Sequence, residues 1–189
     1  LASSLKVAIE GLDPTKYTRT PVDIATPGFD TYAGTETFFR RSNTHIVEHD
    51  CMVLGTGPMS DAMLMKLIWT VGMLAGRHAG RITILTGYFP HSRSDKDEGD
   101  DILTTLPILH DAIKGVAGPT GVHRWICFDP HSDQITSTGR SGLVTPVLLT
   151  RKLLRFCLEK AASEMTGEKN IVLGFPDASA EKRYRSAMK

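Results

Sequence analysis

Short apolar runs alternate along this chain with longer segments in which apolar residues recur every three or four positions. The runs CMVLG at 51–55 and RITILTGYF at 81–89 are typical of buried strands. Between them, apolar residues at helical spacing follow Ser60, a favourable N-cap residue, and end at Gly76, which suits a helix stop. We therefore predict a strand at 51–55, a helix over 60–76 and a second strand at 81–89.

The same alternation continues toward the end of the chain. The pattern predicts a helix over 101–118, a strand at 124–129, a helix over 145–167 and a strand at 170–177. The second of these helices has clear boundary signals, with Thr145 as the cap, Pro146 at the first helical position and Gly167 at the end.

Strands that alternate with helices predict an α/β fold, in which a mostly parallel sheet has helices on both faces. The first fifty residues are less regular, and within them the segments 21–26 and 35–39 are candidate strands flanking that sheet. The length of 189 residues and the hydrophobic content of 41% suffice for one well-buried domain and the start of a second.

Charge and cysteine content narrow the class of protein. The net charge of +1 gives no overall attraction to nucleic acid or to a membrane surface. The three cysteines have no metal-like spacing, and an odd number without clustering favours a reducing compartment, the cytoplasm or an organellar matrix. There is no signal-peptide pattern. The chain begins at Leu1 and stops at Lys189 inside an expected helix, so we expect a fragment or a trimmed chain.

Charged and polar residues gather where three predicted strands end. In open α/β sheets, ligands bind beyond the carboxyl ends of the strands, so residues at these positions are candidates for chemistry. They are Arg93, Asp95 and Lys96 after the second strand, Asp129, His131 and Gln134 after the third, and Asp177, Lys182 and Arg183 after the last.

These residue types favour a phosphorylated ligand held with a divalent cation. Arg93 offers a planar set of donors that matches phosphate oxygens. Asp129, His131 and Asp177 offer oxygen and imidazole ligands, and Mg²⁺ takes few protein ligands while binding substrate phosphates. The sequence contains neither a Walker A pattern nor G-x-G-x-x-G, which argues against a P-loop or a dinucleotide fingerprint.

Each candidate has a simpler explanation when it is taken alone. Arg93 and Asp95 would form an exposed ion pair, contributing ~0–1 kcal/mol. His131 would be a hydrogen-bonded structural residue, and Asp177 would cap the last helix. The acidic run DEGDD at 97–101 would be a solvated loop. Only the joint placement of the three loops favours a binding site.

Four segments, in order, resemble ribose-phosphate pyrophosphokinase, the phosphoribosyl pyrophosphate (PRPP) synthetase family. YFPHSRSDK is similar to the ATP-contacting segment of the family, whose core is Arg-Gln-Asp-Lys/Arg. FDPHSDQ is similar to its Asp-Leu-His-Ala-Ser-Gln segment, and FPDASAEKR to its Ser-Pro-Asp-Ala-Gly-Gly-Ala-Lys-Arg segment. YAGTET is similar to Phe-Ser-Asn-Gln-Glu-Thr, a loop that in the family reaches the adenine of a neighbouring subunit.

The resemblance implies a phosphoribosyltransferase-like fold and a Mg²⁺-dependent transfer of diphosphate from ATP to ribose 5-phosphate. It implies that His131 and Asp177 are catalytic residues and, with Asp129, the metal ligands. Arg93 and Gln134 would hold ATP, with Asp95 orienting them. The resemblance further implies a homo-oligomer in which Tyr32 and Glu36 contact the adenine bound by a neighbouring subunit.

The chain departs from the family pattern at several positions. Gly34 stands where the family has asparagine, Pro130 replaces an apolar residue, and Ser179 and Ala180 replace two glycines. The basic catalytic loop and the ribose-phosphate loop of the second domain of the family are missing from these 189 residues. We therefore expect an N-terminal PRPP-synthetase-like domain at 1–175, with the start of a second domain at 176–189.

Two alternatives to the enzyme remain open at this point. One is a catalytically inactive homologue that serves as a regulatory or structural subunit of a larger assembly. The other is a nucleotide-binding module with a different substrate, since one fold supports many functions.

Overall fold

The computed structural model describes most of the chain from the second residue to the end of the last long helix. The described residues are 2–16, 21–40, 44–57, 59–95, 97, 103–132, 134–137, 143–164, 172, 174–175, 177–178, 180–181 and 185.

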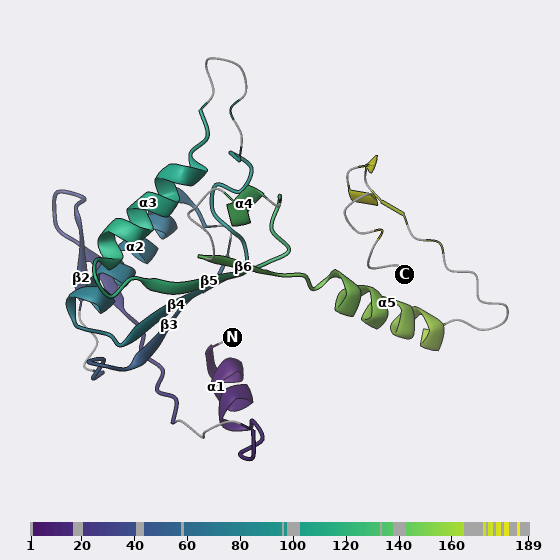
Figure 1. Ribbon diagram of the computed structural model, residues 1–189, viewed down its shortest axis with the longest axis horizontal. Helices are drawn as coiled ribbons and strands as arrows, with labels where there is room; N and C mark the ends of the chain where they lie inside the picture. Colours follow the sequence, from purple (N-terminus) through teal and green to yellow (C-terminus); the bar gives the residue numbers. More distant parts are fainter. Residues whose placement is uncertain are drawn as a thin grey trace.

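A four-stranded parallel sheet forms the centre of the protein (Figure 1). The strands lie side by side in the order in which they occur in the sequence, as β3 (Asp50–Gly55), β4 (Arg81–Thr86), β5 (Val122–Phe128) and β6 (Val144–Val147). Because each connection steps in the same direction with the same handedness, the helices between the strands fall on one face.

Helices α2 (Asp61–Gly76) and α3 (Leu106–Ala117) cover that face and pack against each other, whereas α1 (Ala2–Glu10) lies on the other side of the sheet (Figure 1). A short helix α4 (Gln134–Ser137) follows β5, and α5 (Thr150–Glu164) follows β6. Helix α5 has no buried residue and extends away from the sheet. This is the α/β class with a parallel sheet that the sequence predicts.

The core lies between the sheet and the pair α2 and α3. Trp125 on β5 has no exposed surface, and its ring centroid lies 4.5 Å from that of Phe89. The indole nitrogen of Trp125 donates a hydrogen bond of 2.9 Å to the hydroxyl of Thr86, which is equally buried. This hydrogen bond pairs two buried polar groups next to the end of β4.

An antiparallel hairpin of β1 (Gly28–Thr31) and β2 (Thr37–Arg40) lies beside α2. The ring of Phe29 lies edge-on to Phe39 at 5.0 Å and 6.4 Å from the ring of Trp69 on α2. Figure 1 shows the hairpin on the side of α2 that faces away from α4.

Most of the predicted elements between 51 and 129 are confirmed. The strand at 51–55 and the helix over 60–76 agree with β3 and α2 to within one residue. Ser60 is the N-cap residue of α2, but its hydroxyl makes no capping hydrogen bond. The strand at 81–89 ends three residues early, at Thr86, and the predicted helix over 101–118 begins only at Leu106.

The predicted helix over 145–167 is wrong at its start. Thr145 and Pro146 belong to β6, and the helix begins at Thr150. Pro146 pairs with Cys127 at the edge of the sheet, and an edge strand is where a residue without an N–H is tolerated. Gly167, the predicted helix end, lies outside the described residues.

The flanking-strand predictions for the first fifty residues are confirmed only in part. The segment 35–39 overlaps β2, whereas 21–26 forms no strand. The sequence patterns did not predict α1, β1 or α4. Of the predicted strand at 170–177, Val172, Gly174 and Phe175 are described without regular structure, and most of the rest lies outside the described residues.

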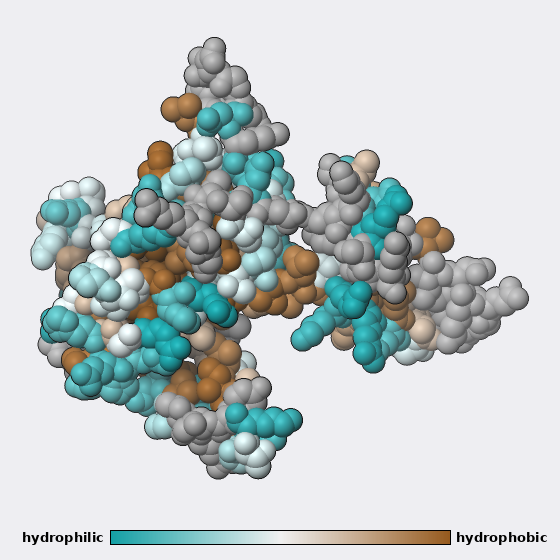
Figure 2. Space-filling view, in the orientation of Figure 1, coloured by the Kyte–Doolittle hydropathy of each residue, from teal (hydrophilic) through white to brown (hydrophobic). Residues whose placement is uncertain are grey.

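Exposed apolar side chains mark the linker between β6 and α5. Leu148, in that linker, is 68% exposed, and Figure 2 shows an apolar patch where the chain leaves the sheet for α5.

Within the described part of the chain, none of the helices has the length and apolar content needed to cross a bilayer.

Candidate functional site

The loop after β4 carries two predicted ligand-binding residues and is fastened to the start of α3. Arg93 is exposed and Asp95 is half-buried. Between them, Ser94 Oγ accepts a hydrogen bond of 3.0 Å from the backbone N–H of Thr105, and the carbonyl of Ser94 accepts one from the hydroxyl of Thr104. These bonds leave the side chain of Arg93 projecting from an anchored segment.

The loop after β5 meets the loop after β4 through Gln134, the first residue of α4. With the amide oriented by its hydrogen-bond partners, the nitrogen of Gln134 donates to Asp95 Oδ2 at 2.9 Å and to the carbonyl of Asp95 at 3.1 Å. The loops that follow β4 and β5 are therefore in direct contact.

Asp129, directly after β5, supports the chain turn into α5. Its Oδ1 accepts hydrogen bonds from the backbone N–H of Leu149 at 3.2 Å and from the hydroxyl of Thr150 at 3.1 Å. Its backbone has a φ of 39°, a conformation that aspartate tolerates better than most residues. One carboxylate oxygen of this predicted metal ligand therefore accepts from protein donors, and no hydrogen bond from a described residue engages Oδ2.

The predicted catalytic histidine is accessible. His131 is exposed and lies two residues after Asp129, which is half-buried. Beside it, the hydroxyl of Ser132 is buried and has no hydrogen-bond partner among the described residues, and the same holds for Ser92 in the loop after β4. Buried hydroxyls are normally paired, so each loop has one polar atom that a ligand or a water could satisfy. Sequence analysis named neither serine, because an isolated serine gives no signal.

Asp177 forms a local cap. Its Oδ1 accepts a hydrogen bond of 2.7 Å from the backbone N–H of Ala180, which is the N-cap arrangement that sequence analysis set beside the catalytic interpretation. The neighbouring basic residues Lys182 and Arg183, and Lys96 in the first loop, lie outside the described residues.

Tyr32 and Glu36 lie at the turn of the hairpin and do not join the other candidates. Glu36 is exposed and Tyr32 is 59% exposed, while the ring of Tyr32 lies 4.4 Å from that of Phe38. The backbone N–H of Tyr32 donates to the carbonyl of Glu36 at 2.9 Å and closes the turn. The turn is therefore available for contacts outside its own chain.

The structure does not gather the predicted metal ligands into a cluster. Among the described residues, which include Asp129, His131 and Asp177, no group of three His, Cys, Asp or Glu side chains is placed to hold a metal ion. A cation at this place would therefore depend on ligand phosphates and water for most of its coordination.

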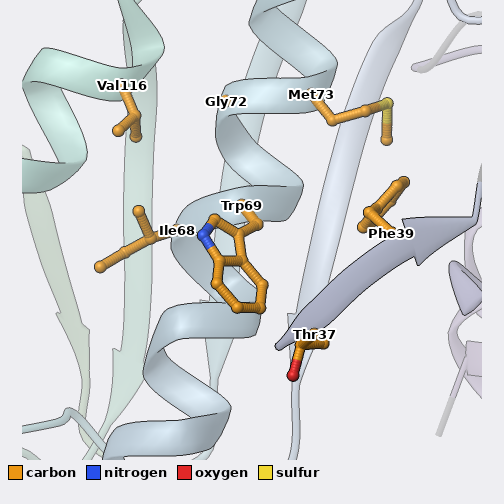
Figure 3. A pocket seen from close by; sticks show the side chains of 7 residues that line it. All are labelled: Thr37, Phe39, Ile68, Trp69, Gly72, Met73 and Val116. Carbon is orange, nitrogen blue, oxygen red and sulfur yellow. The ribbon is translucent and has the colours of Figure 1, made fainter. Parts of the chain in front are cut away.

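The structure also contains an apolar pocket of about 470 Å³ between the hairpin and the helices (Figure 3). Its lining residues are Thr37, Phe39, Ile68, Trp69, Gly72, Met73 and Val116. Its described lining includes none of the predicted site residues and no charged group for a phosphate. The pocket is therefore separate from the strand-end site.

Comparison with solved structures supports the fold assignment. The chain is similar to the crystal structure of phosphoribosylpyrophosphate synthetase from Mycobacterium smegmatis, with a TM-score of 0.68 and 22% identity over 88% of this chain. At that identity the likeness shows the fold alone. The chain spans 54% of that structure's length. No family model and no curated protein sequence matches this chain.

Proposed function

We propose that this chain is part of a PRPP-forming enzyme. That enzyme would be a ribose-phosphate diphosphokinase that uses Mg²⁺, ATP and ribose 5-phosphate in nucleotide biosynthesis. The observation that carries the proposal is the contact between Gln134 and Asp95, which joins the loops that follow two adjacent parallel strands. It supports a single site formed by these two loops, and the fold similarity to a PRPP synthetase supports the chemistry that we propose for it.

The proposed reaction is a substitution at phosphorus. The anomeric hydroxyl oxygen of ribose 5-phosphate forms a bond to the β-phosphorus of ATP, and the bond from that phosphorus to the α–β bridging oxygen breaks. AMP leaves with the bridging oxygen, and the hydroxyl proton is released. Such a reaction depends mainly on positioning and on neutralising phosphate charge.

The loop residues have distinct proposed roles. Arg93, exposed on an anchored segment, would donate to the phosphate oxygens of ATP. Gln134 would help to hold ATP, and Asp95 would orient both groups, which is consistent with the hydrogen bonds that fix the Gln134 amide. His131 and Asp177 would act at the reacting phosphates and ribose.

The donor set suits a weakly held Mg²⁺ rather than a preformed metal centre. Asp129 has one carboxylate oxygen that is not used in capping α5, and His131 is exposed nearby in sequence. Mg²⁺ retains several waters and binds substrate phosphates, so it requires few protein ligands. When bound, the ion would neutralise phosphate charge. Asp129, His131 and Asp177 are its proposed ligands.

The hairpin residues have a proposed role in a contact between copies of the protein. Tyr32 and Glu36 are exposed at a turn on the far side of α2 from α4. This position suits a contact with the adenine bound by a neighbouring copy in a homo-oligomer. The residues that bind ribose phosphate would come from a second domain, of which residues 176–189 would form the beginning.

The direct test is release of AMP from ATP in the presence of ribose 5-phosphate and Mg²⁺. Wild-type protein should release AMP, and His131→Ala should abolish most of the release. His123→Ala is the matched control, because His123 is an exposed histidine near the opposite end of β5 and should leave the rate unchanged. No release from intact wild-type protein would contradict the enzymatic function.

A binding measurement separates the two parts of the charged loop. Arg93→Ala should weaken Mg·ATP binding by roughly tenfold or more, because a charge-assisted hydrogen bond is lost. Asp100→Ala, in the acidic run outside the described residues, should have little effect. Equal effects from the two variants would mean that the phosphate contact lies elsewhere.

A second candidate function is a catalytically inactive homologue that serves as a regulatory or structural subunit. One observation favours it. Asp129 and Asp177 each use a carboxylate oxygen to accept hydrogen bonds from backbone N–H groups of this chain, and that oxygen is then not free for a metal ion or a substrate. ATP binding without AMP release would support this function over the enzyme.

A further inference from the structure

His91 joins the starts of two helices to the loop that carries Arg93. Its ring nitrogen Nδ1 lies 3.0 Å from the hydroxyl of Thr105, the N-cap residue of α3. Its other ring nitrogen, Nε2, lies 3.4 Å from Oδ1 of Asp61, the first residue of α2. In the neutral tautomer with its proton on Nε2, Nδ1 would accept a hydrogen bond from the hydroxyl of Thr105. The N–H at Nε2 would then face the carboxylate of Asp61.

The backbone of His91 needs this support. Its φ is 55°, in the left-handed region that residues other than glycine seldom occupy. Such conformations persist where surrounding contacts hold them. The carbonyl of His91 accepts a hydrogen bond of 2.9 Å from the backbone N–H of Ser94, so the unusual backbone forms the turn that contains Arg93.

The two ends of this turn are anchored at the same place. Ser94 accepts from the backbone N–H of Thr105, and the side chain of His91 contacts the hydroxyl of that same Thr105. Arg93 lies between the two anchors, and the next residue, Asp95, accepts hydrogen bonds from Gln134. The direction of the Arg93 side chain therefore depends on whether His91 remains in place.

We propose that His91 is a positioning residue that fixes the turn 91–94 on the helix starts and thereby aims Arg93 at the phosphates of bound ATP. The effect of His91 on ATP binding rests on the proposed function, whereas its anchoring of the turn 91–94 does not. The His91 ring itself makes no contact with the nucleotide, and all of its effect passes through the turn.

The first experiment measures Mg·ATP binding to the protein by calorimetry. His91→Ala should weaken binding about tenfold, since Arg93 is no longer held in place. His91→Asn should recover most of the affinity, because asparagine tolerates positive φ and keeps a polar atom near the position of Nδ1. Unchanged binding by His91→Ala, or no recovery by His91→Asn, would overturn the proposal.

A matched control exists elsewhere in the chain. His78 is an exposed histidine with a φ of 58°, and it lies in the turn after α2, away from the loop that carries Arg93. His78→Ala should cause a loss of thermal stability comparable to that of His91→Ala but leave Mg·ATP binding unchanged. If His78→Ala weakens binding as much, the effect of His91 is one of general stability and the proposal is wrong.

A double variant tests whether His91 acts through Arg93. If it does, His91→Ala combined with Arg93→Ala should bind Mg·ATP no more weakly than Arg93→Ala alone. Independent, additive losses would contradict action through Arg93.

Hydrogen exchange distinguishes failure of this inference from failure of the proposed function. His91→Ala should accelerate amide exchange in a peptide covering 89–95, and His78→Ala should not. If wild-type protein binds no ATP, the nucleotide function and the aiming of Arg93 at ATP both fail. Faster exchange then still supports anchoring of the turn by His91, and unchanged exchange overturns that as well.

Discussion

The amide nitrogen of Gln134 lies 2.9 Å from the carboxylate of Asp95, so the first residue of α4 is hydrogen-bonded to the loop that follows β4. This contact joins two segments that are 39 positions apart in the sequence. It is the physical link between the two loops in which the candidate ligand-binding residues lie.

The link predicts coupled effects on ligand binding. Asp95→Ala and Gln134→Ala should each weaken Mg·ATP binding by roughly tenfold, because each removes a partner that orients the other. The double variant should be little worse than either single variant, as expected for residues in one network. Calorimetric titration measures all three. Fully additive losses would show that the two side chains act separately.

The buried contact between Trp125 and Thr86 predicts a loss of stability. Thr86→Val keeps the shape of the side chain but leaves the buried indole N–H of Trp125 without an acceptor. The free energy of unfolding should fall by about 1–3 kcal/mol, the cost of an unsatisfied buried donor. Urea denaturation followed by circular dichroism measures the change.

Thr86→Ser is the control for this prediction, because serine retains the accepting oxygen and loses only a methyl group. It should cost less than Thr86→Val. A smaller loss for the valine variant would mean that the hydrogen bond contributes little and that packing decides the stability at this position.

The close approach of Gly80 to Glu48 predicts that even a methyl group is not tolerated there. A Cβ at Gly80 would lie 2.6 Å from the carbonyl oxygen of Glu48 and 2.9 Å from its carbonyl carbon. Because both are backbone atoms, Gly80→Ala should lower the free energy of unfolding by about 1–3 kcal/mol through strain.

Gly76 provides the comparison for Gly80. It is the last residue of α2, and a Cβ there would meet no atom within 4 Å. Gly76→Ala should therefore leave stability unchanged or raise it by about 1 kcal/mol or less, since alanine favours the helix. Equal destabilisation by both alanine variants in urea denaturation would refute the steric explanation.

The cysteines should differ sharply in reactivity. Burial raises the pKa of the Cys127 thiol from its ordinary 9.0 to about 11, whereas Cys157 on α5 is exposed. At pH 8, a thiol reagent should modify Cys157 quickly and Cys127 only when the protein unfolds. Mass spectrometry of the labelled peptides identifies each site. Rapid labelling of Cys127 in folded protein would contradict its burial.

The same raised pKa gives a pH dependence of stability. Well below pH 9 the thiol is protonated in both the folded and unfolded states, so Cys127 does not contribute to the pH dependence of stability there. As the pH rises from 9 toward about 11, the unfolded state loses the proton first, and stability decreases. Cys127→Val should reduce this decrease, and an identical decrease in the variant would exclude the thiol as its source.

The elements around the site follow closely from local sequence patterns. The alternation of apolar runs with helical spacing predicts β3, α2 and β4 because each buries one face against the same core. The candidate residues Arg93, Asp95 and Gln134 were selected because polar residues in the loop after a buried strand have a fixed place in such a fold. No pattern in the sequence showed that Asp95 and Gln134 touch, because that contact depends on neighbouring strands and on a helix of four residues.

The errors have equally local causes. Thr145 and Pro146 satisfy the rules for a helix start, yet the pairing of Pro146 with Cys127 at the sheet edge determines their conformation. The capping role of Asp129 was not predicted, because a carboxylate after a strand has the same sequence signature in a cap as in a metal site. For Asp177 the sequence allowed both roles, and the predicted cap is present. His91 was not selected from the sequence, since its partners Asp61 and Thr105 lie 30 and 14 residues away.

The two tryptophans occupy environments that make them separate optical reporters. Trp125 is completely buried beside Phe89, while Trp69 is 38% exposed on α2 at the contact with the hairpin. Detachment of the hairpin would change the emission of Trp69 and leave that of Trp125 constant until the core unfolds. In Trp125→Phe the remaining Trp69 would report release of the hairpin, and in Trp69→Phe the remaining Trp125 would report loss of the whole fold. One fluorescence titration of each variant would thus separate the two events.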